Sequence, residues 1–533
     1  MFSSEDIKKE WLGCGHLKNN YQVLTKDGSQ KIPLVAKSIL VGAVAGVVVV
    51  AYRIALTKAE MLAFWGYEQL RENMVWIPVA ILLLCAMGYL TGALVSRNKM
   101  ISGSGIPQLE GIIHGHFQDR KSWLHTLCSK FIGGSIAIAG GLSLGREGPS
   151  IQLGASVAEG IGNKIADSRL ERKLLMASGA SAGLAAAFNA PLAGVIFSLE
   201  EIFKYFSPTI LLSTMSAAVT ADFISKQVFG TKPVFDFVLT QAIPLKHYWV
   251  LLVLGLFMGV MGSIYNWLLL RIQKVYKQTS WLNDKVKMMI PFLFALLFGM
   301  VFPVILGGGH RVIEELSLQT GLMMLCLIFV LKLFFSVVSF GSGAPGGIFF
   351  PLLVLGASLG GVFATILIRF LDFPPELFYN FVILAMAGYF TAIVRAPITG
   401  VVLIMEMTGS FASMLQLSIV ALISYVVADL LKSPPIYDAL LDNLVKGNHK
   451  EHKKESNRRI IIELPIQHGS KLEEKEIKDI EWPEKTLLVT VKRGEREILP
   501  QGDTLLKAGD HLSILTDVNH ESAIREVLNR MNE

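Results

Sequence analysis

Long apolar stretches recur along most of this chain and constrain its fold more than any other feature. They span residues 34–56, 76–95, 174–199, 249–270, 289–306, 322–340, 378–405 and 419–431. A helix that crosses a bilayer needs about 20 consecutive apolar residues, and several stretches reach that length. Only 17% of the residues are charged, whereas soluble domains carry about 25%. The sequence therefore predicts a polytopic membrane protein.

Basic residues around the first apolar stretches predict the orientation of the chain. No A-x-A-like cleavage site precedes the first stretch, so no cleavable signal peptide is expected. Lysine and arginine are enriched in cytoplasmic loops, and here they gather before the first stretch and over 97–130 (Lys8, Lys9, Lys18, Lys26, Lys31; Arg97, Lys99, Arg120, Lys121, Lys130). Both segments are therefore expected in the cytoplasm, with a short external loop near 57–75.

The alternative is that these basic residues only solvate loops. For Lys130, near the end of a span, two hypotheses stand: attracting anions or snorkelling to the surface.

The remaining composition argues against several other classes of protein. The four cysteines are scattered (Cys14, Cys85, Cys128 and Cys326) and have the spacing of neither a metal site nor a disulfide framework, so free thiols are expected. The net charge of +6 gives no indication of nucleic-acid binding. No metal site is predicted.

The chain divides into four predicted segments. A cytoplasmic N-terminal segment (1–32) precedes the membrane body (33–442), and a charged linker (443–458) leads to a soluble tail (459–533). Within the tail, IIIEL, TLLVTV and HLSILTD are short, β-branched and apolar, which is typical of strands. HESAIREVLNRMN is amphipathic and closes the chain as a helix. A small α+β domain of about 75 residues is therefore expected, near the lower size limit for independent folding.

The membrane body contains an internal repeat. GREGPSIQLGAS (145–156) aligns with GIFFPLLVLGAS (347–358), and NAPLAGVIFSLE (189–200) aligns with RAPITGVVLIME (395–406). The two offsets, 202 and 206 residues, agree closely. The body is therefore interpreted as a duplicated unit, although membrane-helix composition alone produces some likeness. Transporters with such repeats place the substrate at the repeat interface, between broken helices.

Four glycine- and proline-rich segments interrupt the apolar stretches: GSGIPQLEG (103–111), GREGPSIQ (145–152), GAPGGIFFP (343–351) and KSPPIYDALL (432–441). Glycine and proline break helices, and broken backbone inside a membrane must line a cavity or be buried in protein. Helix starts leave about four N–H groups unpaired and carry roughly half a positive charge. Several such starts directed at one point form an anion site. We expect these segments to converge on one, with hydroxyl donors from Ser104 and Tyr437.

Glu147 lies between two glycines in this apolar context. A carboxylate beside a helix start is itself an anion that fits the site, so Glu147 is predicted to occupy it when charged and to leave when protonated. The alternative is a structural ion pair with Arg146. Glu200 and Glu201 point in different directions on a helix, so one is expected to face inward and the other to contact another helix.

Together these motifs resemble the CLC family of chloride channels and transporters. GSGIP, GREGP, GIFFP, AAFNAPLAG with its Glu-Glu pair, and a tyrosine after the last span all occur, over roughly 33–442. The resemblance implies a mainly α polytopic fold of two inverted repeats, in a homodimer with one anion pathway per subunit. It also implies a multi-pass protein of the plasma or inner membrane with both termini in the cytoplasm.

The resemblance also implies residue roles. Ser104 and Tyr437 correspond to the central chloride-coordinating side chains, Glu147 to the gating glutamate and Glu201 to the inner proton-transfer glutamate. The remaining expected chloride-binding residues are Gly105, Ile106, Gly145, Arg146, Ile348 and Phe349, the last two through their backbone N–H groups. Because both glutamates are present, a voltage- and pH-sensitive Cl⁻/H⁺ antiporter is favoured, with a passive CLC channel as the alternative. No cofactor other than bound chloride is expected.

The tail resembles the C-terminal subdomain of RCK proteins, the TrkA-C type, with LPQGDTLLKAGDHLSIL (499–515) as its core. Such tails dimerise and bind small regulatory ligands. Cyclic di-AMP is the leading hypothesis, and an unliganded assembly module is the alternative.

Two further classes of function fit the sequence less well. GLSLG (141–145) matches the G-x-S-x-G pattern of hydrolases with Ser143 as nucleophile, but that motif needs a strand-to-helix turn and a histidine partner. Here it lies in membrane sequence, so no enzyme is predicted. A cation channel controlled by its tail is the other alternative, and the lack of a TVGYG-type filter argues against it.

Overall fold

The computed structural model describes residues 28–117, 122–204, 206–235, 237, 243–279, 282–448, 459–494, 496–517 and 521–532. The chain forms two compact units, with the division after Asn443. The first is almost entirely helical and the second contains a small sheet. Cys14 lies outside the described residues, while Cys85, Cys128 and Cys326 are free thiols.

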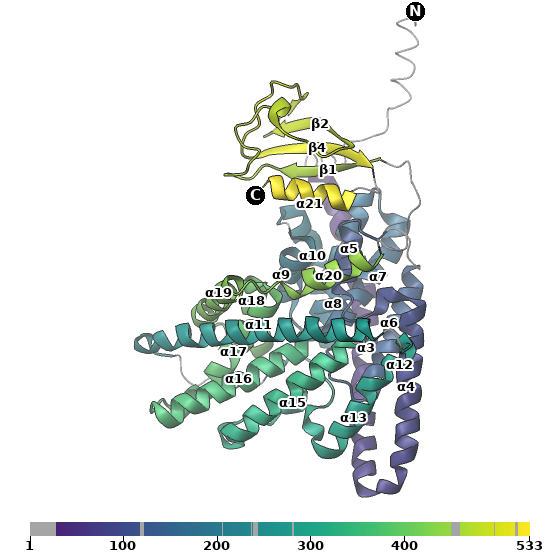
Figure 1. Cartoon of the computed structure of the whole chain (residues 1–533), viewed down its shortest axis with the longest axis vertical. Helices are drawn as coiled ribbons and strands as arrows, with labels where there is room; N and C mark the ends of the chain where they lie inside the picture. The colour runs from purple at the N-terminus through teal and green to yellow at the C-terminus, as the bar shows by residue number, and fades with distance from the viewer. Residues whose placement is uncertain are drawn as a thin grey trace, which may run out of the picture. The chain divides into compact units, whose positions relative to one another are not determined.

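The membrane unit is a bundle of helices of very different lengths (Figure 1). Its first half contains α3 (Gly28–Glu72), α4 (Ile77–Arg97), α5 (Ile106–Ile113), α6 (Trp123–Ala139), α7 (Glu147–Ile165), α8 (Arg169–Phe188), α9 (Pro191–Phe197), the π-helix η3 (Ser198–Phe203) and α10 (Pro208–Phe229). Its second half contains α11 (Trp249–Gln278), α12 (Asp284–Lys287), α13 (Met289–Val301), α14 (His310–Glu314), α15 (Leu322–Gly341), α16 (Phe349–Phe370), α17 (Phe378–Val394), α18 (Pro397–Thr408), α19 (Met414–Leu430) and α20 (Ile436–Asn448).

Helices long and apolar enough to span a bilayer confirm that this is a membrane protein. Among the described residues they number six: Ile32–Glu72, Met74–Arg97, Trp249–Gln278, Leu322–Gly341, Phe349–Phe370 and Pro375–Val394. α8 is different in kind. It is rich in Gly, Ala and Ser, and nearly all of its residues from Leu174 to Phe188 are buried inside the protein. The apolar stretch 174–199 is thus a core helix followed by a break at Asn189.

The external loop predicted near 57–75 is wrong. α3 continues as one helix to Glu72, and the chain turns only at Asn73, whose side chain accepts a hydrogen bond from the amide of Val75 at 3.2 Å. The segment after the apolar stretch lacks proline and is rich in helix formers, so the helix propagates beyond the apolar residues. At 45 residues, α3 is about 67 Å long, well over the bilayer thickness of about 30 Å.

The duplicated unit predicted from sequence is present in the structure. α7 begins at Glu147 and α16 at Phe349, at matching positions of the aligned repeats. The later pairs also match, because α9 and α18 both begin with proline, at Pro191 and Pro397, and each follows a residue with positive φ, Asn189 or Arg395. Each half therefore breaks its helices at the same places.

The second unit is a four-stranded antiparallel sheet with one helix. The strands are β1 (Arg459–Pro465), β2 (Thr486–Arg493), β3 (Arg496–Ile498) and β4 (Asp510–Asp517), in the order β1-β4-β2-β3, and α21 (Glu521–Met531) follows. The three predicted strands and the closing helix are confirmed. β3 and the irregularity in β2 between Leu488 and Thr490 were not predicted.

Candidate functional site

Two aligned glycines hold the starts of α7 and α16 together. The amide of Gly145 donates to the carbonyl of Gly347 at 2.6 Å, and the amide of Gly347 donates back to Gly145 at 2.7 Å. Residues at equivalent positions of two repeats can bond reciprocally only where a two-fold axis passes between them. The helix starts, with their unpaired first-turn amides, therefore lie side by side at this axis.

The segment that begins at Gly103 joins the same place. The amide of Gly103 donates to Gly343 O at 3.2 Å, and the amide of Gly346 donates to Gly103 O at 3.0 Å. Three of the four glycine- and proline-rich segments are thus directly hydrogen-bonded to one another. The predicted convergence is confirmed for these three.

Two buried lysines support the loops behind the helix starts. Lys130 Nζ donates to the carbonyls of Ile101 and Gly103 at 2.9 and 2.6 Å, and Lys332 Nζ donates to Ile305 and Gly307 at 2.8 Å each. Both side chains are fully buried. Snorkelling is therefore wrong for Lys130, because its ammonium satisfies loop carbonyls in the interior. The sequence reasoning missed Lys332, although the 202-residue offset from Lys130 would have found it.

Ser104 lies against the first turn of α7. Its side chain is buried, and its Oγ accepts a hydrogen bond from the amide of Ile106 at 3.3 Å. A Cβ at Gly148 would come 2.7 Å from Ser104 Cβ. The amide of Ile106, one of the expected chloride-binding residues, thus already has an acceptor in this conformation.

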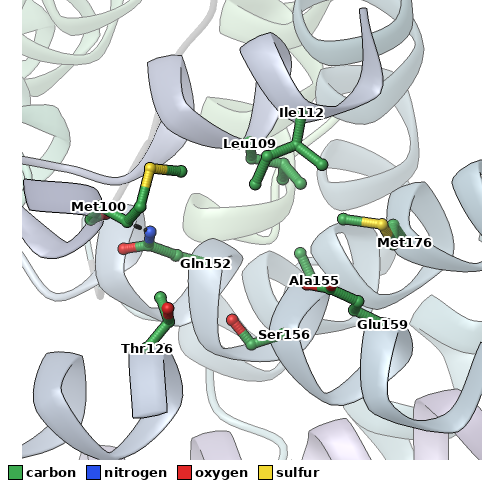
Figure 2. A pocket seen from close by; sticks show the side chains of 9 residues that line it. All are labelled: Met100, Leu109, Ile112, Thr126, Gln152, Ala155, Ser156, Glu159 and Met176. Atoms are coloured by element: carbon green, nitrogen blue, oxygen red, sulfur yellow. Dashed lines mark hydrogen bonds between the residues drawn. The ribbon is translucent and has the colours of Figure 1, made fainter. Parts of the chain in front are cut away.

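Gly105 caps α5 in the left-handed conformation, with φ 89°. A Cβ here would also meet Gln152 Oε1 at 2.2 Å, so glycine is required for two reasons. Gln152 Nε2 donates to Met100 O at 2.6 Å, and a cavity of about 20 Å³ opens beside it (Figure 2). That volume holds about one water molecule.

Glu147 is the first residue of α7 and is completely buried. Its carboxylate faces the backbone amides of Glu147 and Phe350, but neither of its oxygens has a hydrogen bond of good geometry among the described residues. Arg146 Nε is 3.9 Å from Glu147 Oε1 and also lacks a hydrogen bond. The alternative of a structural ion pair with Arg146 therefore has no hydrogen bond to sustain it. A Cβ at Gly145 would meet Glu147 Oε2 at 2.3 Å and Phe350 N at 3.2 Å, which places the carboxylate at the joint start of both helices.

Tyr437 reaches the same region from α20. Its ring is fully buried and its hydroxyl has no hydrogen-bond partner among the described residues. Phe197 connects it to α16, with ring centroids 6.4 Å from Tyr437 and 6.2 Å from Phe349. Ile348, which caps α16, is also buried. The fourth segment thus approaches the site through aromatic packing.

The Glu-Glu pair lies on η3 and divides as predicted. Glu201 is buried, and its Oε1 has no partner among the described residues. Glu200 instead accepts hydrogen bonds from the amides of Ile398 and Thr399 at 3.2 and 2.7 Å, at the start of α18. The Tyr437 hydroxyl lies within electrostatic range of both Glu201 and Glu147.

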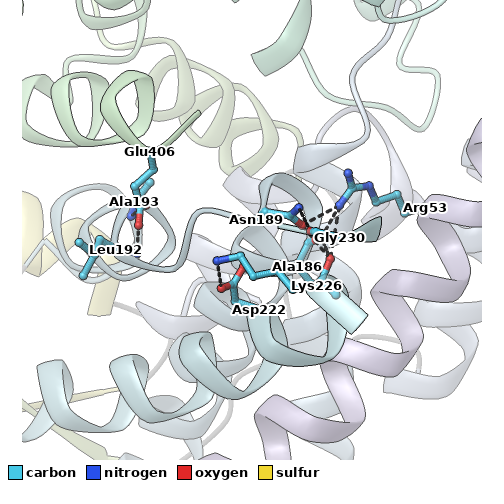
Figure 3. Close-up of polar contacts among 10 residues, drawn as sticks. Arg53, Ala186, Asn189, Leu192, Ala193, Asp222, Lys226, Gly230 and Glu406 are labelled. Atoms are coloured by element: carbon cyan, nitrogen blue, oxygen red, sulfur yellow. Dashed lines mark hydrogen bonds and ion pairs between the residues drawn. The ribbon is translucent and has the colours of Figure 1, made fainter. Parts of the chain in front are cut away.

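Glu406 repeats the Glu200 contact in the other half of the molecule. It accepts from the amides of Leu192 and Ala193 at 3.1 and 2.7 Å, at the start of α9 (Figure 3). Each repeat therefore caps a helix of the other with an equivalent carboxylate. Glu406 aligns with Glu200 in the sequence repeat, but the alignment did not predict that Glu406 caps α9.

The comparisons with known proteins agree with this geometry. Residues 87–429 match the voltage-gated chloride channel family, and residues 461–529 match the TrkA-C domain. The H⁺/Cl⁻ exchange transporter ClcA of Vibrio parahaemolyticus is 34% identical over 436 residues, which cover 79% of this chain and 92% of the relative.

Solved structures show the same fold. A slow cyanobacterial Cl⁻/H⁺ antiporter matches with a TM-score of 0.71 and 29% identity, over 78% of this chain and 99% of that one. A CLC-type fluoride/proton antiporter matches with a TM-score of 0.63 and 25% identity, over 77% of this chain and 98% of that one. The chain therefore belongs to the CLC family of voltage-gated chloride channels and transporters, and it carries a TrkA-C domain after the membrane unit.

Proposed function

We propose that this protein is a Cl⁻/H⁺ antiporter in which Glu147 is the gating glutamate. The observation that carries the proposal is the fully buried Glu147 carboxylate at the joint start of α7 and α16, where it faces the backbone amides of Glu147 and Phe350. A chloride ion and this carboxylate are both anions, so they compete for the same helix-start amides. Protonation of Glu147 removes its charge and lets chloride take its place.

Ser104 and Tyr437 are the proposed side-chain ligands of chloride, and Gly105, Ile106, Gly145, Arg146, Ile348 and Phe349 complete the proposed set. Apart from Arg146, this set contains no lysine or arginine. Amides and hydroxyls hold it weakly enough for release, as conduction requires. The buried Glu201 is the proposed inner proton-transfer group, because a second carboxylate is needed to take the proton towards the other face.

The relatives support exchange over passive conduction. The Vibrio transporter is named an H⁺/Cl⁻ exchanger and the cyanobacterial structure a Cl⁻/H⁺ antiporter. By the same likeness we propose a homodimer in the plasma or inner membrane, sensitive to voltage and pH, with both termini in the cytoplasm. The TrkA-C domain is the proposed regulatory unit, with cyclic di-AMP as the candidate effector.

Flux measurements in proteoliposomes test the exchanger. An imposed chloride gradient should drive protons uphill through the wild type, and Glu201→Gln should abolish proton movement while chloride flux continues. Chloride flux without any proton movement in the wild type would establish the passive channel instead. Adding cyclic di-AMP to the same vesicles should change the chloride rate of the full chain. An unchanged rate would leave the tail as an assembly module.

A further inference from the structure

Lys204 ends the π-helix η3 in a conformation that is unusual for its residue type. Its φ is 54°, in the left-handed region. A residue with a Cβ is strained there, and such strain persists only where the surroundings hold the residue in place. The contacts of the Lys204 side chain show what holds it.

Two carboxylates from two other helices bind the Lys204 ammonium. Lys204 Nζ lies 2.7 Å from Glu110 Oε1 of α5, and it also donates to Asp438 Oδ1 of α20. Glu110 is 3% exposed, so it is one of the few carboxylates in the interior of the membrane unit. A buried carboxylate is costly without a partner, and Lys204 provides that partner.

Each of the three elements joined by Lys204 carries a residue of the proposed anion pathway. α5 starts directly after Ser104 and Gly105. On α20, Asp438 is the immediate neighbour of Tyr437. On η3, Glu201 lies three residues before Lys204. One ammonium group therefore links α5, which follows the Ser104 loop, α20, which carries Tyr437, and η3, which carries the inner glutamate.

We propose that Lys204 is a positioning residue for chloride binding, and that its ion pair with Asp438 holds the start of α20, and with it the Tyr437 hydroxyl, at the proposed site. This inference rests on the proposed function, because it assumes that Ser104 and Tyr437 are chloride ligands. It differs from simple electrostatic attraction, in which Lys204 would only raise the local concentration of anions. The two roles predict opposite effects for one substitution.

Asp438→Asn separates these roles by the sign of its effect. The substitution removes a negative charge beside the pathway and leaves Lys204 in place. If Lys204 acts by attraction, chloride binding becomes tighter. If the ion pair positions Tyr437, chloride binding becomes weaker, by about threefold to tenfold, as expected for one hydrogen bond of ordinary net strength.

The measurement is isothermal titration of chloride into purified full-length protein in detergent. The matched control is Asp284→Asn, which breaks an ion pair with Lys287 inside one short helix and should leave the affinity unchanged. Lys204→Arg keeps both ion pairs and should remain within about twofold of the wild type. If Asp438→Asn aggregates, Asp438→Glu is titrated in its place. Its longer side chain shifts the ion pair with Lys204 and should also weaken chloride binding.

Unchanged or tighter binding in the Asp438 variant overturns the positioning role. If the wild type itself binds no chloride, the proposed function fails first. If the wild type binds chloride and the Asp438 variant binds it with equal affinity, only the proposed role of Lys204 is rejected.

Discussion

Glu147 and Phe349 occupy equivalent positions of the two repeats, at the first residue of α7 and of α16. The backbone around them is nearly symmetric, as the reciprocal bonds of Gly145 and Gly347 show. The side chains at these two positions differ, because α7 begins with a carboxylate and α16 begins with an aromatic ring. The proposed gate thus depends on one residue that breaks an otherwise repeated arrangement.

Gly148→Ala tests the close packing of α7 against the Ser104 loop. The added Cβ would lie 2.7 Å from Ser104 Cβ and 3.0 Å from Ser104 O, so the loop must move. We expect chloride binding to weaken about tenfold, which corresponds to about 1.4 kcal/mol. Titration of chloride into the purified protein measures it.

Gly66→Ala is the matched control for this variant, because a Cβ at Gly66 meets nothing within 4 Å. It should leave chloride affinity unaltered. Equal affinity of the Gly148 variant and the wild type would contradict the proposed place of Ser104 in the site.

At the scale of elements, α9 and α18 are short helices whose starts are capped across the two-fold axis. Glu406 caps α9 and Glu200 caps α18, each through two backbone amides. A carboxylate at a helix start is favoured by the unpaired amides and by the helix dipole. The exchange of caps ties the halves together at the place where both break their helices.

Glu406→Ala should therefore lower the stability of the membrane unit by about 1–2 kcal/mol. Glu406→Gln should lose less, because its amide oxygen still accepts one hydrogen bond. Thermal unfolding of the full-length protein in detergent would show this order. Glu376→Ala changes an exposed carboxylate of the turn Pro375–Leu377, so this control variant should unfold at the same temperature as the wild type. Equal stability of all three variants would show that the caps contribute nothing.

At the scale of the whole molecule, the membrane unit and the tail have separate cores. The tail contains an ion pair between the half-exposed Arg493 of β2 and the buried Asp510 of its TrkA-C core segment. Arg493 Nε and Nη2 donate to the two oxygens of Asp510 at 2.8 and 2.7 Å, and the amide of Lys507 donates to the same carboxylate at 2.9 Å. Burial alone would raise the pKa of Asp510, but the hydrogen bonds from Arg493 and Lys507 outweigh it and hold the pKa below its usual value.

This lowered pKa makes the contribution of Asp510 to the stability of the tail depend on pH. A carboxyl group whose pKa is lower in the folded than in the unfolded state stabilises the folded state at pH values above its unfolded pKa, which is about 3.9 for aspartate. This stabilisation is lost as the pH falls through the pKa of the folded state. Asp510→Asn should therefore destabilise the tail at pH 7 by about 1–2 kcal/mol. The difference from the wild type should disappear towards pH 2.

Hydrogen exchange of the β4 amides in the full-length protein measures this effect, with the two proteins compared at each pH. Glu481→Gln, at an exposed carboxylate before β2, serves as the control and should exchange like the wild type. Protection of β4 that is equal in wild type and Asp510→Asn at pH 7 would contradict the role of the pair.

The sequence by itself determined the membrane class, the duplication and the strands of the tail, and it predicted the residues of the proposed anion site. These follow from local or repeated patterns: apolar length, the 202- and 206-residue offsets, period-two alternation and helix-breaking glycines. Such patterns need no knowledge of what a residue touches. The same locality explains the error at α3, because hydropathy marks where apolar residues end and not where helical hydrogen bonding ends.

Only the tertiary structure decided which carboxylates are free and which are paired. The sequence places Glu110, Glu200, Glu201 and Glu147 alike in apolar surroundings, yet Glu110 meets Lys204, Glu200 caps a helix of the other repeat, and the remaining two keep unpartnered oxygens among the described residues. Their partners are distant in sequence, up to 199 residues away. Pairing over such separations depends on how the helices pack around the two-fold axis, which no local pattern encodes.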